Sequence, residues 1–175
     1  GDFYNGMRDG KGICTYSNGS YYRGDWKKGT QNGKGIYCNS DGSSYDGNFV
    51  NGKYQGYGIY ISKNGNRYEG EWSEGKADGK GTMFYANGDK YVGDWRKGEL
   101  IGKGIYTMKN KEVYEGEFCN GIKEGEGKYQ FKNGDYYVGS WKKGQPNGWG
   151  TLYYVNGEKY QGGWIDGKPH GKGIL

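Results

Sequence analysis

The chain has 175 residues and a net charge of +5, and it contains 39 Gly, 20 Tyr and 6 Trp. Its mean hydropathy of −1.12 excludes a globule built on an aliphatic core, and no apolar run approaches the roughly 18 residues of a membrane-spanning helix. Disordered chains are poor in aromatics, so the aromatic content of 18% argues for a folded protein.

A 23-residue repeat organises the whole sequence. Tyrosines recur at this spacing from Tyr22 to Tyr160, and each repeat is numbered here from its tyrosine. Positions 3, 8, 12 and 14 are Gly in every copy, and position 5 is Trp or Phe. We interpret positions 1, 3 and 5 as structural residues: Tyr22, Gly24, Trp26, Tyr45, Gly47, Phe49, Tyr68, Gly70, Trp72, Tyr91, Gly93, Trp95, Tyr114, Gly116, Phe118, Tyr137, Gly139, Trp141, Tyr160, Gly162 and Trp164.

One repeat array therefore covers residues 1–175. It comprises a partial repeat at 1–21, full repeats at 22–44, 45–67, 68–90, 91–113, 114–136 and 137–159, and a partial repeat at 160–175. The array starts and stops inside a repeat, so we expect it to be a fragment of a longer one.

Each repeat predicts two short strands. Positions 1, 3 and 5 share parity, so two aromatics lie on one face with a glycine between them, where a neighbouring ring has space to lie over the backbone. Positions 14 to 18 form the second strand, with an apolar residue at position 16, from Cys14 to Leu175. The fold class is thus predicted as all-β, an elongated, twisted, single antiparallel sheet of 23-residue β-hairpin repeats.

The two connections in each repeat are predicted to differ. Positions 6 to 13 form a longer loop, which accommodates Pro146 and Pro169 at position 10. Positions 20 and 21 read Asn-Gly or Asp-Gly, which favour two-residue turns with positive φ. Lys111 replaces the glycine of one such turn, where we expect a looser geometry.

These features resemble the MORN (membrane occupation and recognition nexus) repeat. Residues 68–82 carry the Tyr-x-Gly-x-Trp and Gly-x-Gly pattern, and the resemblance extends over the whole chain. It implies an elongated β array that serves binding and assembly, with no activity of its own. The bias toward Lys, Asn, Tyr and Ile suits an AT-rich genome such as that of an apicomplexan parasite. Similar MORN proteins there form dimers and organise the ring at the base of dividing daughter cells.

Catalytic, cofactor and metal sites are not predicted. Paired carboxylates such as Glu69 with Glu71 recur at phases where other repeats carry Asn or Ser, which indicates a solvated face. Cys14 is at repeat position 16 and Cys38 at position 17, so their side chains should lie on opposite faces of the sheet. A zinc site assembled from Cys14, Cys38, Cys119 or His170 across a subunit contact is left as an open alternative.

Basic residues cluster around the predicted long loop. Positions 6 and 7 supply a candidate rim for anionic lipid, made of Lys27, Lys28, Arg96, Lys97, Lys142 and Lys143. Position 13 adds Lys11, Lys34, Lys80, Lys103 and Lys172. Nucleic acid is disfavoured as a partner, because 20 acidic residues are interspersed among the 25 basic ones.

Apolar residues outside the repeat phases are candidates for partner contacts, because the fold does not demand them. They are Val50, Tyr54, Tyr57, Val92, Leu100, Ile101, Val113, Ile122, Trp149 and Ile165. Val92, Leu100, Ile101 and Val113 fall within one repeat and are the candidate interface.

The sequence predicts a non-catalytic scaffold that binds other proteins and itself as a homodimer. Such a scaffold would be cytoplasmic and would organise a structure between cytoskeleton and membrane. Two alternatives stay open. One is a regulatory array attached to a lipid kinase or methyltransferase, and the other is a module that binds phosphoinositide or other anionic lipid.

Overall fold

The computed structural model describes residues 1–174, and Leu175, the last position-16 residue, lies outside the described chain. The fold is all-β as predicted, and residues 1–174 contain no helix. The chain forms two compact units, one of residues 1–86 with 96–98 and one of residues 87–95 with the remainder. Each unit is described by itself.

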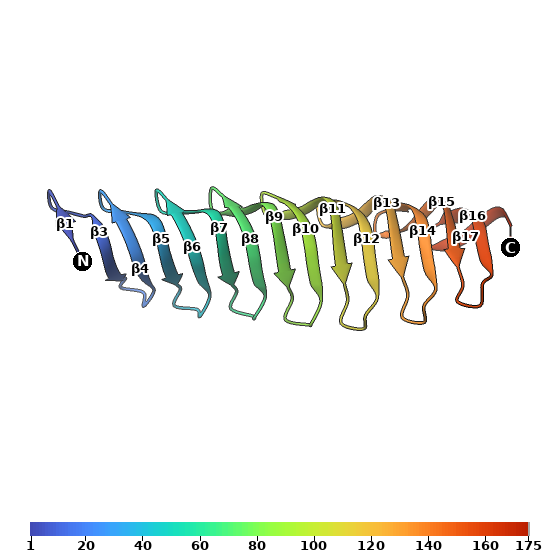
Figure 1. Cartoon of the computed structure of the whole chain (residues 1–175), viewed down its shortest axis with the longest axis horizontal. Coiled ribbons are helices and arrows are strands. Elements are labelled where there is room, and N and C mark those ends of the chain that lie inside the picture. The colour runs from blue at the N-terminus through green and yellow to red at the C-terminus, as the bar shows by residue number, and fades with distance from the viewer. Residues whose placement is uncertain (175) are drawn as a thin grey trace. The chain divides into compact units, whose positions relative to one another are not determined.

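The first unit begins with the two-residue strands β1 (Phe3–Tyr4) and β2 (Met7–Arg8), which pair with each other. An antiparallel sheet follows, whose strands lie side by side in chain order (Figure 1). They are β3 (Gly10–Thr15), β4 (Tyr21–Lys27), β5 (Thr30–Cys38), β6 (Ser44–Val50), β7 (Lys53–Ile61), β8 (Arg67–Ser73) and β9 (Lys76–Phe84).

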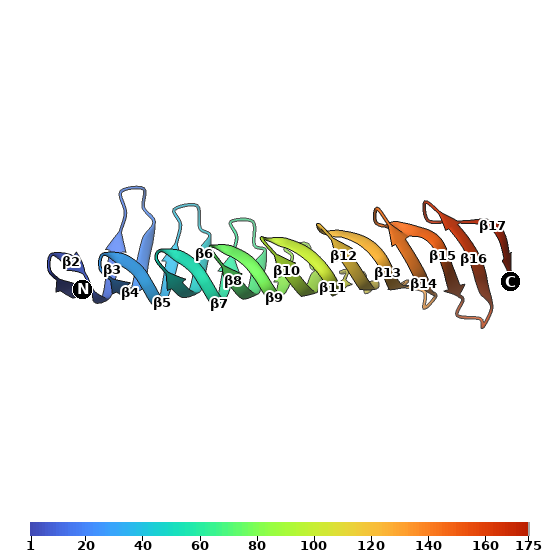
Figure 2. The same ribbon diagram turned by 90° about the horizontal axis from the view of Figure 1, so that it is seen from above.

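The second unit has the same architecture. Its strands are β10 (Lys90–Arg96), β11 (Glu99–Thr107), β12 (Val113–Cys119), β13 (Ile122–Gln130), β14 (Tyr136–Lys142), β15 (Gln145–Tyr153), β16 (Lys159–Ile165) and β17 (Lys168–Ile174). They too follow one another in chain order, and their hairpins are antiparallel. Figure 2 shows the strands of each unit bending along their length.

Strand register places repeat positions on two distinct faces. Tyr22 pairs with Tyr37 and Gly24 pairs with Gly35, so positions 1, 3, 5, 10, 14 and 16 share what we call the aromatic face. Positions 2, 4, 11, 13 and 15 lie on the opposite side, which we call the charged face. The predicted parity of the aromatic residues is confirmed.

The aromatic face carries the core of each unit. Tyrosines at position 1 are almost fully buried from Tyr22 to Tyr137, and the ring at position 5 packs edge-on against them, as Trp26 does on Tyr22 with centroids 5.0 Å apart. The indole Nε1–H of Trp72 donates to the Gly58 carbonyl at 3.1 Å. A buried tryptophan therefore finds a hydrogen-bond partner in the preceding repeat.

A cross-strand glycine pair lies beneath each position-1 ring. A Cβ at Gly24 would come within 2.5 Å of the Gly35 Cα and 2.6 Å of the Tyr22 hydroxyl oxygen. The ring that fills the predicted space thus belongs to the same strand. The register shifts between Gly24 and Trp26, and the Tyr22 hydroxyl donates to the Asp25 carbonyl inside this bulge at 2.8 Å.

The predicted long loop at positions 6 to 13 is wrong. The connection is a two-residue turn at positions 7 and 8, where Lys28 and Gly29 have φ of 48° and 79°. Both flanking strands continue to this turn, with a bulge around position 12 absorbing two extra residues of the second strand. Pro146 and Pro169 consequently lie in strands β15 and β17 rather than in loops.

The Asn-Gly connections also differ from the prediction. Only Gly19 has positive φ, and its N–H donates to the Tyr16 carbonyl at 3.0 Å, so the loop has three residues. Asn18 instead accepts the Ser20 N–H through its side chain at 3.0 Å. Asn is favoured here because its side chain accepts a hydrogen bond from the backbone two residues further on. The looser turn expected at Lys111 is wrong, since Lys111 adopts φ of 74° and donates to the Met108 carbonyl at 2.9 Å.

We expect the position-3 glycines to be irreplaceable. In Gly70→Val, the new Cβ would lie 2.5 Å from the Gly81 Cα and 2.6 Å from the Lys80 carbonyl oxygen, both backbone atoms. Overpacking of this kind costs about 3 kcal/mol, which should lower the melting temperature by roughly 6–12 °C. The control Glu71→Ala alters an exposed neighbour and should change it by less than about 2 °C. Equal shifts in thermal unfolding would contradict the face assignment.

Lys111→Gly should stabilise the chain. A lysine in the left-handed region costs about 1 kcal/mol relative to glycine, so the melting temperature should rise by roughly 2–4 °C. Gly157→Lys is the matched reverse change, because Gly157 has φ of 92° and open space around its Cβ position. It should lower the melting temperature by a similar amount. A rise for both variants, or for neither, would refute the backbone explanation.

Candidate binding surfaces

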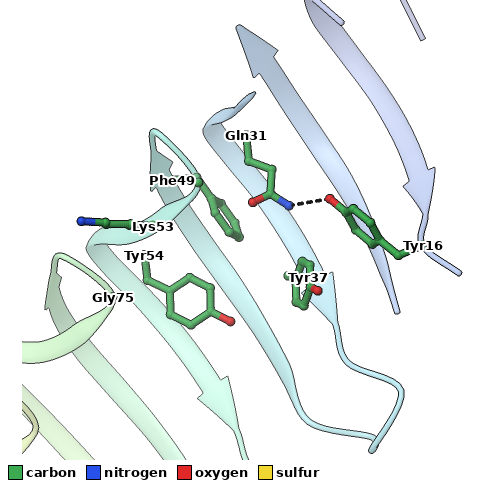
Figure 3. A pocket seen from close by; sticks show the side chains of 8 residues that line it. Tyr16, Gln31, Tyr37, Phe49, Lys53, Tyr54 and Gly75 are labelled. Carbon is green, nitrogen blue, oxygen red and sulfur yellow. Dashed lines mark hydrogen bonds between the residues drawn. The ribbon is translucent and has the colours of Figure 1, made fainter. Parts of the chain in front are cut away.

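A groove opens on the aromatic face of the first unit. It has a volume of about 400 Å³ and is lined by Tyr16, Gln31, Tyr37, Phe49, Gly52, Lys53, Tyr54 and Gly75. Strands β5, β6 and β7 position most of these side chains (Figure 3). The Gln31 amide donates to the Tyr16 hydroxyl at 3.1 Å, and burial raises the pKa of Tyr54 to about 12. The groove therefore presents neutral rings at physiological pH.

The only charged side chain at this groove is neutralised nearby. The Lys53 ammonium lies 2.5 Å from the Glu74 carboxylate, and Figure 3 shows it pointing away from the rings of Tyr16 and Tyr37. The groove is thus aromatic and amide-lined, without a free carboxylate or histidine among the residues that line it.

A second groove of about 570 Å³ lies on the charged face of the second unit. Val92 and Ile105 are its apolar side chains and are 41% and 42% exposed. Charged residues of both signs line the rest of it, namely Lys103, Glu115, Glu126 and Lys128. Apolar side chains beside a polar rim are typical of a surface that contacts protein.

The candidate interface residues do not form one patch. Leu100 and Ile101 are neighbours in β11, so their side chains face opposite sides of the sheet. Leu100 occupies position 10 on the aromatic face and is half-buried, whereas Val92, Ile101 and Val113 belong to the charged face. Val92 lines the second groove, whereas Val113 lines a separate hollow with Phe131.

The candidate lipid-rim residues, which we call the lysine rim, lie at the edge that the two-residue turns form in each unit, not in the predicted long loops. Lys27, Lys28, Lys142 and Lys143 are exposed there, as are Arg96 and Lys97. Acidic side chains share this edge, however. Asp9, Asp78 and Glu124, all at position 11, accept the backbone N–H groups of Lys28, Lys97 and Lys143 at 3.0–3.3 Å.

Lysines at position 13 do not extend the rim. They lie within strands on the charged face, opposite position 4, as the Lys11–Asp25 pair at 2.8 Å shows. The hydrogen bond from Lys11 and the Lys34 backbone N–H hold the pKa of the Asp25 carboxyl below its usual value. The side chain of Lys172 lies outside those described.

The cysteines give no sign of a shared site. Cys14 and Cys38 are half-buried, Cys119 is exposed, and all three are free thiols. Within residues 1–174, no group of three His, Cys, Asp or Glu side chains is placed to hold a metal ion. The described chain also has no helix that is long and apolar enough to cross a bilayer.

Several apolar residues outside the repeat phases are exposed, as predicted. Tyr57 and Trp149, both at position 13, are 59% and 60% exposed. Sequence reasoning missed the isoleucines at position 15, of which Ile13, Ile36 and Ile105 are exposed. Because these isoleucines recur at the same repeat position, the sequence could have revealed them. It also missed position 10, whose side chains cover the rings of the aromatic face.

Comparison with known families decides the class of the protein. The MORN repeat profile matches residues 1–21, 22–44, 45–67, 68–90, 91–113, 114–136, 137–159 and 160–175. The chain belongs to the MORN repeat family. The eight matched segments of this MORN array coincide with the predicted repeat boundaries.

This MORN array is similar in structure to domains that have been solved. The TCP10 domain of Danio rerio CPAP has a TM-score of 0.52 and 10% identity, with 88% of this chain and 73% of that chain covered. The TCP domain of Drosophila melanogaster SAS-4, solved with a proline-rich motif of Ana2, has a TM-score of 0.48 and 12% identity, with 87% and 77% covered. None of the curated proteins matches the chain in sequence.

Proposed function

We propose that this MORN array is a non-catalytic scaffold that binds proteins and associates with itself. In this role it works in the cytoplasm, at a structure between cytoskeleton and membrane. Membership of the MORN family supports an assembly role. Each unit presents an aromatic and a charged face of its sheet, which suits binding of macromolecules.

The observation that carries this proposal is the exposure of large apolar side chains that the repeat does not require. Trp149 and Tyr57 stand at position 13, where most other repeats carry lysine, and both project from the charged face. Exposed aromatic residues are enriched in protein interfaces, where they become buried anchors. Their presence on strands rather than on loops gives a partner a rigid surface.

Self-association is assigned to the second groove. Val92 and Ile105 are its apolar side chains, and its charged side chains are two lysines and two glutamates. A two-fold contact places the same patch against itself, so lysines of one copy can meet glutamates of the other. We place the interface at this groove and not at the four residues predicted from the sequence, because Leu100 belongs to the opposite face.

Val92→Asp combined with Ile105→Asp should abolish self-association. The wild-type mass should rise toward that of a dimer across micromolar concentrations in light scattering, whereas the variant should stay monomeric. Both residues are already exposed, so thermal unfolding should change little. Val155→Asp, at a site that is 75% exposed on a turn, is the matched control and should behave as wild type. A monomeric wild type would refute self-association, and a dimeric double variant would move the interface elsewhere.

Contact of the lysine rim with anionic lipid is proposed as weak and dependent on charge alone. Acidic side chains at position 11 share the rim, and screening acts over about 8 Å at 0.15 M ionic strength. Only lysines that touch the membrane surface therefore contribute. We expect no preference for one phosphoinositide headgroup.

Liposome flotation tests this expectation. Binding to neutral vesicles should be negligible, and binding to anionic vesicles should fade by about 0.3–0.5 M salt. Replacement of Lys27, Lys28, Arg96, Lys97, Lys142 and Lys143 by Ser should reduce it further. Tight, salt-resistant binding to one phosphoinositide would instead favour a lipid-recognition module.

A further inference from the structure

Position 10 lies over a recurring set of rings on the aromatic face. Within the second unit, this position is Lys123, and its ammonium is 5.0 Å from the Tyr114 ring, 4.6 Å from Tyr129 and 5.3 Å from Trp141. These rings come from positions 1 and 16 of the same repeat and position 5 of the next. We call this arrangement the position-10 cage.

The cage around Lys123 holds a largely desolvated cation. Burial lowers the pKa of Lys123, while the nearby Glu112 carboxylate opposes this shift. Glu112 also accepts a hydrogen bond from the Tyr129 hydroxyl at 2.8 Å. Aromatic rings attract an ammonium through their quadrupoles, so the chain supplies its own ligand to this cage.

The equivalent cage of the 45–67 repeat is filled by a ring. Tyr54 stacks on Tyr45 with centroids 3.7 Å apart and an interplanar angle of 7°. It also meets Phe49 and Trp72 edge-on, at 5.5 Å and 5.3 Å. Position 10 therefore decides what occupies each cage.

The cage of the 22–44 repeat is left open. Position 10 is Gln31 here, and its amide turns to the Tyr16 hydroxyl rather than covering the rings (Figure 3). The space that remains is the groove of about 400 Å³ on the aromatic face of the first unit. Four aromatic side chains line it, namely Tyr16, Tyr37, Phe49 and Tyr54.

The first unit shows a second cation over such rings. Arg8, also at position 10, holds its guanidinium 5.1 Å from the centre of the Trp26 ring. Two position-10 side chains, one in each unit, thus place a positive charge on the aromatic face. The open cage is likewise walled by aromatic rings, three Tyr and one Phe, and its lining lysine, Lys53, pairs with Glu74 instead of covering them.

We propose that the open cage at Gln31 binds the alkylammonium group of a methylated lysine side chain on a partner protein. This inference rests on the proposed protein-binding function and specifies what the partner presents. Position 22, which supplies Glu112 to the Lys123 cage, is Ser20 at the open cage. Recognition then depends on the rings rather than on a carboxylate. Rings alone favour a methylated ammonium, because it sheds its water more readily than a primary one.

A reciprocal exchange at position 10 tests the proposal on the intact chain. The probe is the trimethyllysine derivative with blocked termini, titrated while the tyrosine ring resonances are followed by NMR. Wild-type protein should bind one equivalent and shift the Tyr37 and Tyr54 signals. The neutral analogue, with carbon in place of the quaternary nitrogen, should bind at least about tenfold more weakly.

Gln31→Lys fills the open cage from within and should abolish probe binding. Lys123→Gln empties the other cage and should raise the stoichiometry from one to two. Both variants alter half-buried side chains, and circular dichroism verifies their folding. Equal binding of the neutral analogue, persistence of binding in Gln31→Lys, or no binding to wild type would each overturn the proposal. Self-association is measured without the probe, so its failure is distinguishable from failure of the cage.

Discussion

A tyrosine ring lying flat on two glycines is the contact on which each unit depends. The ring at position 1 leaves no room for a Cβ at position 3 or at position 14 of the facing strand. Its hydroxyl then reaches the position-4 carbonyl, as Tyr114 does with Glu117 at 2.9 Å. The bulge that frees this carbonyl also bends the strand, so packing, register and curvature share one cause. A thin sheet thereby obtains a core without a second layer.

Because the glycine and tyrosine positions are fixed by this contact, functional variety is confined to the remaining positions. Position 10 ranges from Arg8 and Gln31 to Lys123 and Pro146, and each choice changes what covers the same set of rings. Position 13 is lysine in most repeats, Glu126 in one, and an exposed aromatic in two, Tyr57 and Trp149. Neither variation removes a ring from the core, since these side chains lie outside the row of buried rings at positions 1 and 5. Within each repeat, the tyrosine and glycine positions therefore maintain the fold, while positions 10 and 13 are free to vary with the binding partner.

Periodicity predicted the fold, the face of each aromatic and the repeat boundaries, because these follow from spacing alone. Turn types were predicted the wrong way round. Asn18-Gly19 suggests a two-residue turn, but only Gly19 has positive φ there, whereas two consecutive positive φ values occur at Lys28 and Gly29. The equivalent turn reads Asn5-Gly6 and Asn51-Gly52 in other repeats, so the same dipeptide marks both connections and does not tell them apart. The candidate interface failed for a related reason, because closeness in sequence put Leu100 and Ile101 in one patch although strand parity separates them.

Charge on this molecule is arranged for local pairing rather than for a long-range field. Lys11 and Lys103 at position 13 face the carboxylates of Asp25 and Glu117 across the strands, and the turn lysines share their edge with the acids of position 11. Such mixed charges cancel beyond a few ångströms but remain distinct at contact, where they favour one register of a partner over another. A flat anionic membrane cannot use that pattern, whereas a second protein surface with its own lysines and glutamates can. The distribution of charge therefore favours protein partners over lipid, independently of the exposed aromatic anchors.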